Sequence, residues 1–154
     1  MRPPPFQAFL EEHREPVYRF LRAMLGPHEA EDAFQETFLS ALRAYRRLPD
    51  GSDLRAWVMT IAHRKAIDAH RGRRRRPDPV GDVPDGAGPS NPEPPDQEVW
   101  RRVRELPPAQ RTAVFLRYAG DLAYRDVAGA MGTSEAAARQ SVRLGLRRLR
   151  EEWR

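Results

Sequence analysis

A stretch near the C-terminus carries arginines at spacings that suit contact with nucleic acid. The arginines are Arg139, Arg143, Arg147, Arg148 and Arg150, and no acidic residue lies between them. Arginine can pair with guanine through two hydrogen bonds, and Gln140 adds a side chain that can pair with adenine in the same way. The later arginines suit phosphates or a protein partner. The stretch therefore predicts contact with DNA, with Arg139, Gln140 and Arg143 toward the bases.

A second cationic block lies near the middle of the chain. Residues 71–76 contain five arginines and no acid, and they extend a predicted helix. The surface of that helix is expected to show His63, Arg64, Lys65 and His70. A positive ridge along one element can track a nucleic-acid strand. Trp57 could stack on an unpaired base, but its place on the apolar stripe favours a core position.

The acidic pair Asp32 and Glu36 is the nearest approach to a catalytic or metal-binding arrangement. The two lie one turn apart, but the four histidines of the chain match no HExxH pattern. The chain has no cysteine, no GxGxxG and no P-loop motif. We therefore expect no enzymatic activity, no metal and no cofactor. Gln35 and Leu39 share the face of the two acids, and this mixture is typical of a protein interface.

The arginines of the C-terminal stretch need a framework that can present them. We expect a short helix over Leu122–Met131, a turn at Gly132-Thr133, and a second helix from Glu135 to about Glu152, capped by Ser134. Two helices joined by a short glycine-containing turn, the second of them basic, are typical of a helix-turn-helix motif.

Helical periodicity also runs through the N-terminal half. A short helix is expected to begin at Phe6 and a separate one at Pro16, where proline suits a first turn. A third helix is expected over about 28–48, with Leu42 on its buried stripe. A fourth is expected to begin near Asp53 and to continue into the arginine block.

The remaining helices are expected before the helix-turn-helix motif. One covers Val99–Leu106, and another begins at Pro108 and ends at Gly120. The residues of this second helix that are expected to lie mostly in the hydrophobic core are Ala113, Val114, Leu116 and Tyr118.

A linker divides the chain into two modules. From Pro77 to Gln97, seven of 21 residues are proline and three are glycine, and no helical or strand periodicity can be drawn through them. Residues 77–99 hold six acids and no base, whereas residues 100–154 hold 12 bases and six acids. Basic modules flanking an acidic connector suggest two surfaces for polyanions. The predicted fold is all-α, with domains at 1–76 and 99–154 and a flexible linker at 77–98.

The chain offers no sign of export or membrane insertion. No apolar run approaches 18 residues, and charged residues are scattered through the first 25 positions. We expect a cytoplasmic protein without membrane insertion.

Several blocks, in order and spacing, resemble those of a sigma-70 family RNA polymerase sigma factor of the extracytoplasmic function (ECF, group 4) type. The blocks are Ala30–Phe38 (AEDAFQETF), Leu54–Asp68 (LRAWVMTIAHRKAID), Leu106–Arg111 (LPPAQR), and Leu116–Tyr118 (LRY) with Tyr124–Ala128 (YRDVA). The resemblance covers nearly the whole chain apart from the linker.

For the N-terminal module, the resemblance implies sigma region 2. The counterparts of Asp32, Gln35, Glu36 and Leu39 bind the beta-prime clamp of core polymerase. The implied minus-ten DNA contacts, around a trapped flipped base, are Asp50, Ser52, His63, Arg64, Asp68, Arg71, Arg73 and Arg74. Arg64 departs from the family pattern, in which many relatives carry Asn, so the base accepted at this position stays open.

For the C-terminal module, the resemblance implies sigma region 4, which sits on the beta flap and places a helix in the major groove of the minus-35 element. The implied contacts are Arg117, Ser134, Arg139, Gln140 and Arg143. The acidic linker is implied to lie in polymerase channels otherwise used by nucleic acid.

The implied function is promoter-specific transcription initiation with assistance to promoter opening. The partners are core RNA polymerase and promoter DNA, and an anti-sigma factor remains open as a third. Two alternatives stay open: a helix-turn-helix regulator that binds duplex DNA without polymerase, and a helical adaptor or decoy that binds only protein. Charge reversal at Arg139 and Arg143 would leave the adaptor's function intact.

Overall fold

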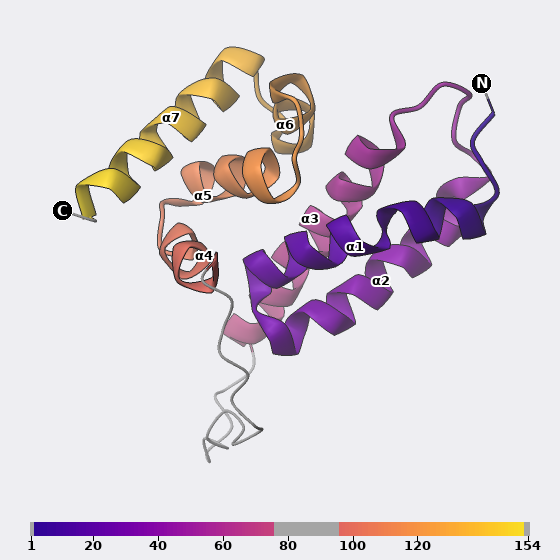
Figure 1. Cartoon of the computed structure of the whole chain (residues 1–154), viewed down its shortest axis with the longest axis horizontal. Coiled ribbons are helices and arrows are strands. Elements are labelled where there is room, and N and C mark those ends of the chain that lie inside the picture. The colour runs from indigo at the N-terminus through magenta and orange to yellow at the C-terminus, as the bar shows by residue number, and fades with distance from the viewer. Residues whose placement is uncertain (1, 76–95, 153–154) are drawn as a thin grey trace.

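The computed structural model describes residues 2–75 and 96–152, and every secondary-structure element in these ranges is a helix (Figure 1). The elements are α1 (Phe6–Leu25), α2 (Pro27–Tyr45), α3 (Leu54–Arg75), α4 (Asp96–Arg104), α5 (Pro108–Val114), the π-helical turn η1 (Phe115–Ala119), α6 (Tyr124–Met131) and α7 (Glu135–Glu152). The predicted all-α fold is confirmed, and α4 begins three residues before the predicted Val99. Among the described residues, no helix is both long and apolar enough to cross a lipid bilayer.

An aromatic cluster holds α1, α2 and α3 together. Phe9 is fully buried, and its ring centroid lies 5.1 Å from that of Tyr45, 5.8 Å from Trp57 and 6.1 Å from Phe38. Such rings combine a large buried apolar area with favourable tilted contacts. Trp57 packs against this core, as predicted, and α3 is thereby fixed against α1 and α2.

Pro16 lies inside α1, so the prediction of two separate helices at the N-terminus is wrong. Proline removes one helical hydrogen bond and costs about 3 kcal/mol in a helix interior. Burial offsets this cost, because Phe9, Val17 and Phe20 lie on one continuous stripe that crosses Pro16 and is 0% exposed. Tertiary packing has overridden the local preference.

Two residues predicted in the core are exposed. Leu42 is 52% exposed, because Phe38 and Ala41 already fill the buried stripe of α2. Tyr118 is 51% exposed, because the helix widens into η1, where the Gly120 amide bonds the Phe115 carbonyl oxygen at 2.9 Å, five residues back. This wider turn changes the phase of the side chains that follow.

Gly145 permits the close approach of α7 to α5. A Cβ atom at Gly145 would lie 2.9 Å from Cγ2 of Val114 and 3.4 Å from Cδ1 of Leu106. Gly145→Val should therefore lower the free energy of unfolding by about 1–3 kcal/mol through overpacking. Gly129→Val is the matched control, since a Cβ at this helical glycine meets nothing within 4 Å. Urea denaturation followed by circular dichroism would compare them, and equal stabilities would contradict the packing argument.

Arginine side chains join the two modules. Arg104 of α4 donates from Nε to the carbonyl oxygen of Ala23 at 2.8 Å and from Nη2 to that of Arg22 at 3.2 Å. A cation at the C-terminal end of α1 also complements the helix dipole. Arg55 of α3 donates from Nε to the carbonyl oxygen of Gly120 at 3.2 Å. These contacts lie away from α7, which forms the outer edge of the C-terminal module (Figure 1).

Candidate nucleic-acid interface

A left-handed glycine and a serine cap form the turn of the helix-turn-helix motif, as predicted. Gly132 adopts a left-handed conformation with φ of 69°, which glycine reaches without a steric cost, and ends α6. The hydroxyl oxygen of Ser134 accepts a hydrogen bond from the Ala137 amide at 3.1 Å and caps α7. This cap commits one acceptor site of Ser134, a predicted DNA contact, to the helix itself.

The exposed face of α7 carries the predicted base-reading residues. Arg139, Gln140 and Arg143 are all exposed. In the free chain they bond their neighbours: Nη2 of Arg139 lies 2.9 Å from Oε1 of Glu135, and Nη2 of Arg143 donates to Oε1 of Gln140. Exposed pairs of this kind contribute little stability, so DNA can replace them at small cost.

A cationic groove of about 290 Å³ runs beside this face. The residues that line it are Tyr124, Arg139, Val142, Arg143, Leu146, Arg147 and Arg150. Its four arginines come from one side of α7, so their charges add along one line. Such a line suits the evenly spaced phosphates of a nucleic-acid backbone.

Arg117 reaches the same region from η1. It is half-buried, and its Nη1 donates to the carbonyl oxygen of Leu122 at 2.9 Å. The guanidinium carbons of Arg117 and Arg139 lie 4.7 and 4.5 Å from the ring centroid of Tyr124. The structure thus brings together two predicted contact residues, through an aromatic residue to which the sequence motif assigned no role.

The second predicted DNA surface lies on α3 and the turn before it. Arg64, Asp68 and Arg71 are exposed on α3, and Asp50 is exposed in the turn. Ser52 donates its hydroxyl to the carbonyl oxygen of Pro49 at 2.7 Å and so closes that turn. The side chains of two further predicted contacts, Arg73 and Arg74, lie outside the described residues.

His63 is buried, so the prediction that it lies on the exposed surface of α3 is wrong. Its position on the inner side of α3 leaves it 5% exposed. Burial, with a smaller contribution from the adjacent Arg64 charge, lowers the pKa of His63 from 6.5 to about 4. It is therefore neutral at pH 7 and adds no charge to the ridge.

The buried His63 should make stability sensitive to acid. Because its folded pKa is below its unfolded value, the unfolded chain binds the proton more readily. The contribution of neutral His63 to the free energy of unfolding is fully present above pH 6.5 and is lost as pH falls toward 4. Wild type should lose about 2 kcal/mol of unfolding free energy from this group between pH 7.5 and pH 5.

The effect can be isolated with His63→Leu, compared by urea denaturation at both pH values with the exposed-site control His28→Gln. The loss in His63→Leu should be smaller by this amount, whereas His28→Gln should behave as wild type. Equal losses in all three proteins would contradict the assignment of the acid-sensitive group.

The α2 face comprises Asp32, Gln35, Glu36, Leu39 and Leu42. All five are exposed, and Leu39 is 46% exposed, as predicted from its place beside the acids. At the edge of this face, Nζ of Lys65 on α3 lies 4.0 Å from Oε2 of Glu36. Sequence reasoning missed Leu42, although its spacing of three residues from Leu39 was the signal for a shared helical face. The face combines negative charge with exposed leucines, a composition that suits a protein partner.

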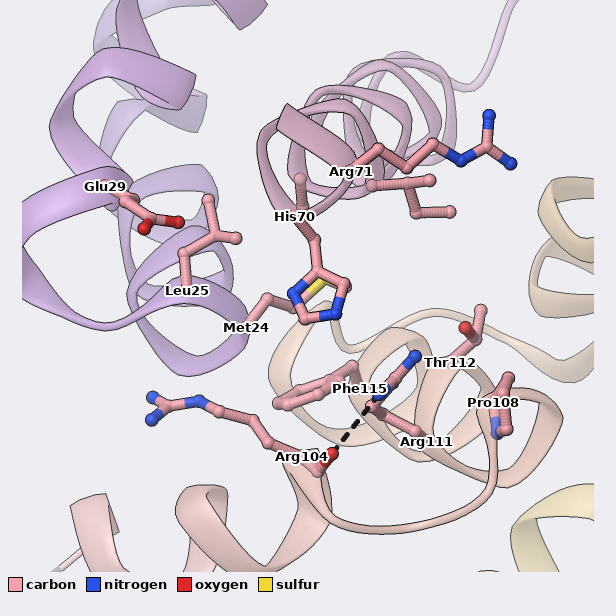
Figure 2. A pocket seen from close by; sticks show the side chains of 12 residues that line it. Met24, Leu25, Glu29, His70, Arg71, Arg104, Pro108, Arg111, Thr112 and Phe115 are labelled. Atoms are coloured by element: carbon pink, nitrogen blue, oxygen red, sulfur yellow. Dashed lines mark hydrogen bonds between the residues drawn. The ribbon is translucent and has the colours of Figure 1, made fainter. Parts of the chain in front are cut away.

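A cavity of about 530 Å³ separates the modules near Arg71. Figure 2 shows the imidazole of His70 reaching from α3 toward Phe115, whereas the guanidinium of Arg71 extends away from the centre. Arg71 therefore borders the cavity and stays accessible to a partner. No cluster of three or more metal-ligating side chains occurs within residues 2–75 and 96–152.

Two family models match separate parts of this chain. The family model for Sigma-70 region 2 matches residues 9–76, and that for Sigma-70, region 4 matches residues 96–149. The RNA polymerase sigma factor CarQ of Myxococcus xanthus is 32% identical over 156 residues, which cover 95% of this chain and 87% of CarQ. The ECF RNA polymerase sigma factor SigG of Mycobacterium tuberculosis is 32% identical over 163 residues, covering 86% of this chain but only 44% of SigG.

Two solved structures share the fold. The sigma factor RpoE of Bartonella quintana, in complex with the anti-sigma factor NepR, superposes with a TM-score of 0.74 at 23% identity, covering 95% of this chain and 94% of RpoE. CnrH, in complex with the cytosolic domain of CnrY, gives a TM-score of 0.73 at 18% identity, covering 96% of this chain and 86% of the CnrH chain.

Proposed function

The chain belongs to the sigma-70 family of RNA polymerase sigma factors, and to its ECF type, and we propose which of its surfaces carries out each step of promoter-specific transcription initiation. The protein is not an enzyme; the polymerase performs the chemistry. The observation that carries the division is the separation of two exposed surfaces of opposite character. The α2 face is acidic and apolar, whereas the exposed face of α7 is cationic.

The α2 face binds core polymerase at the beta-prime clamp. Exposed leucines beside carboxylates can bury apolar area while the acids meet basic groups of the partner. This arrangement leaves α3 and the preceding turn free for DNA. The residues proposed for core binding are Asp32, Gln35, Glu36, Leu39 and Leu42.

The exposed part of α3 and the turn before it contact the minus-ten element. Exposed basic and polar side chains there can hold a displaced strand, and a flipped base is read by contacts to its edge. Arg64 occupies the exposed position next to the buried His63 and is the candidate for base preference. Asp50, Ser52, Asp68 and Arg71 complete the described part of this surface.

The helix-turn-helix motif binds the minus-35 element, with α7 in the major groove. Arg139, Gln140 and Arg143 lie early on α7, where this motif places side chains against base edges. Arg147 and Arg150 lie farther along α7, in the cationic groove of the protein, and are suited to contact phosphates. The same module rests on the beta flap of the polymerase.

We assign residues 1–76 to region 2, 77–98 to the linker and 99–154 to region 4. Helix α4 begins at Asp96, three residues before the last of these boundaries. Since RNA polymerase works in the cytoplasm, the protein is placed there. An anti-sigma factor is a further proposed partner, because RpoE, which shares this fold, was solved in complex with the anti-sigma factor NepR.

Run-off transcription from a genomic fragment library tests the function. Core polymerase is supplied with and without the protein, and start sites are mapped by sequencing. Discrete new starts that share two upstream elements are expected. Core binding without new starts would favour a decoy, and no core binding would favour a regulator that acts on duplex DNA alone.

A further inference from the structure

The ring of Tyr124 contacts two of the arginines predicted to bind DNA. Tyr124 is the first residue of α6, half-buried, and α6 packs against α7 (Figure 1). The guanidinium carbon of Arg117 lies 4.7 Å from its ring centroid, and that of Arg139 lies 4.5 Å away. Both distances are within the range of a cation–π interaction. One ring therefore contacts two cations from two different helical elements.

The Arg117 guanidinium has one hydrogen bond and one ring contact among the described residues. Its Nη1 donates to the Leu122 carbonyl oxygen at 2.9 Å, while its Nε is buried with no hydrogen-bond partner among the described residues. One hydrogen bond leaves a guanidinium free to pivot, because the long side chain has several rotatable bonds. The Tyr124 face supplies the second point of contact.

Arg139 is drawn toward two neighbours with different consequences. Its ion pair with Glu135, at 2.9 Å between Nη2 and Oε1, occupies one of the five guanidinium N–H donors. The aromatic face attracts the cation through the ring quadrupole and uses none of the N–H donors. The ring can therefore hold Arg139 in place while its donors remain available to a base.

We propose that Tyr124 is a positioning residue for minus-35 recognition, whose ring aligns Arg117 and Arg139 for DNA. This inference rests on the proposed function of the helix-turn-helix motif. Without the ring, Arg139 loses one of the two contacts that hold it, so more side-chain freedom must be lost when DNA binds, which weakens binding. The loss falls on the sequence-specific part of the affinity, because phosphate contacts tolerate a less ordered cation.

The experiment measures holoenzyme binding to a promoter mapped by the run-off assay. One duplex keeps the minus-35 element and a second has it scrambled, and the ratio of affinities is the readout. Tyr124→Phe keeps the ring and should leave the ratio within about twofold of wild type. Tyr124→Leu should lower it by about tenfold. Tyr118→Leu is the matched control at an exposed tyrosine and should leave it unchanged.

Two further variants separate positioning from folding. Pentafluorophenylalanine at position 124 keeps the ring shape but reverses the charge of its face, so it should lower the ratio as Tyr124→Leu does. In an Arg139→Ala background, Tyr124→Leu should lower the ratio by less than it does in wild type, because one of the two arginines that the ring contacts is gone.

The outcomes are distinguishable. If wild-type holoenzyme shows no preference for the intact element, the proposed minus-35 function fails. If wild type shows the preference and the pentafluoro variant keeps it, Tyr124 has no positioning role and the inference alone is overturned.

Discussion

Asp32→Arg with Glu36→Arg is expected to weaken binding of the protein to core polymerase by about 100-fold, because like charges brought together at an interface cost several kcal/mol. Both side chains lie on the α2 face, outside the buried stripe of α2. The double variant should therefore keep the helical content and stability of wild type. Glu36 loses only a long contact with Lys65, at 4.0 Å, which contributes little at an exposed site.

The control for this variant reverses two acids elsewhere. Glu11 and Glu15 are also exposed and one turn apart, but they lie on α1. Glu11→Arg with Glu15→Arg changes the net charge by the same amount and should bind core polymerase as wild type does. A pull-down or biolayer titration against core polymerase compares the two. Equal affinities for both double variants would reject the α2 face as the polymerase-binding surface.

Arg139→Ala is expected to cost about 1–3 kcal/mol in binding to promoter DNA if the side chain reads a guanine. This is a loss of about 5- to 150-fold. The loss should fall on the duplex with an intact minus-35 element and relax the preference for one base pair. Arg139 is exposed, and its ion pair with Glu135 lies within one turn of α7, so stability should change little.

Arg150→Ala provides the comparison for Arg139→Ala. Arg150 lines the cationic groove beside α7, as Arg139 does, and is proposed to contact phosphate. Its removal should weaken binding to intact and scrambled duplexes alike and reduce the slope of log affinity against log salt by about 1. Fluorescence anisotropy of the holoenzyme–DNA complex over a salt series gives both quantities. An equal loss on both duplexes for Arg139→Ala would make Arg139 a phosphate contact.

Local features of the chain were predictable because neighbouring residues determine them. The Ser134 cap, the left-handed Gly132 and the basic face of α7 follow from residue types within a few positions. The exposure of Leu39 followed from its helical phase relative to Asp32 and Glu36. Hydrogen-bonding capacity, backbone freedom and helical periodicity act over short sequence distances, so a single sequence contains them.

Other features required knowledge of what packs against each element. Pro16 stays within a helix because the stripe that crosses it is buried, and His63 is neutral because α3 turns it inward. Tyr118 is exposed because η1 changes the helical phase.

Residue types and their spacing were enough to predict helices on both sides of the linker, a capped helix-turn-helix motif, an acidic-apolar face on α2 and a cationic face on α7. The burial of His63, the place of Leu42 on the α2 face and the contacts of Tyr124 with Arg117 and Arg139 emerged only from the packing of the helices. Burial and cation–π contacts depend on distances between elements far apart in the chain. Those distances are set when the helices pack, and helical periodicity within one segment carries no information about them.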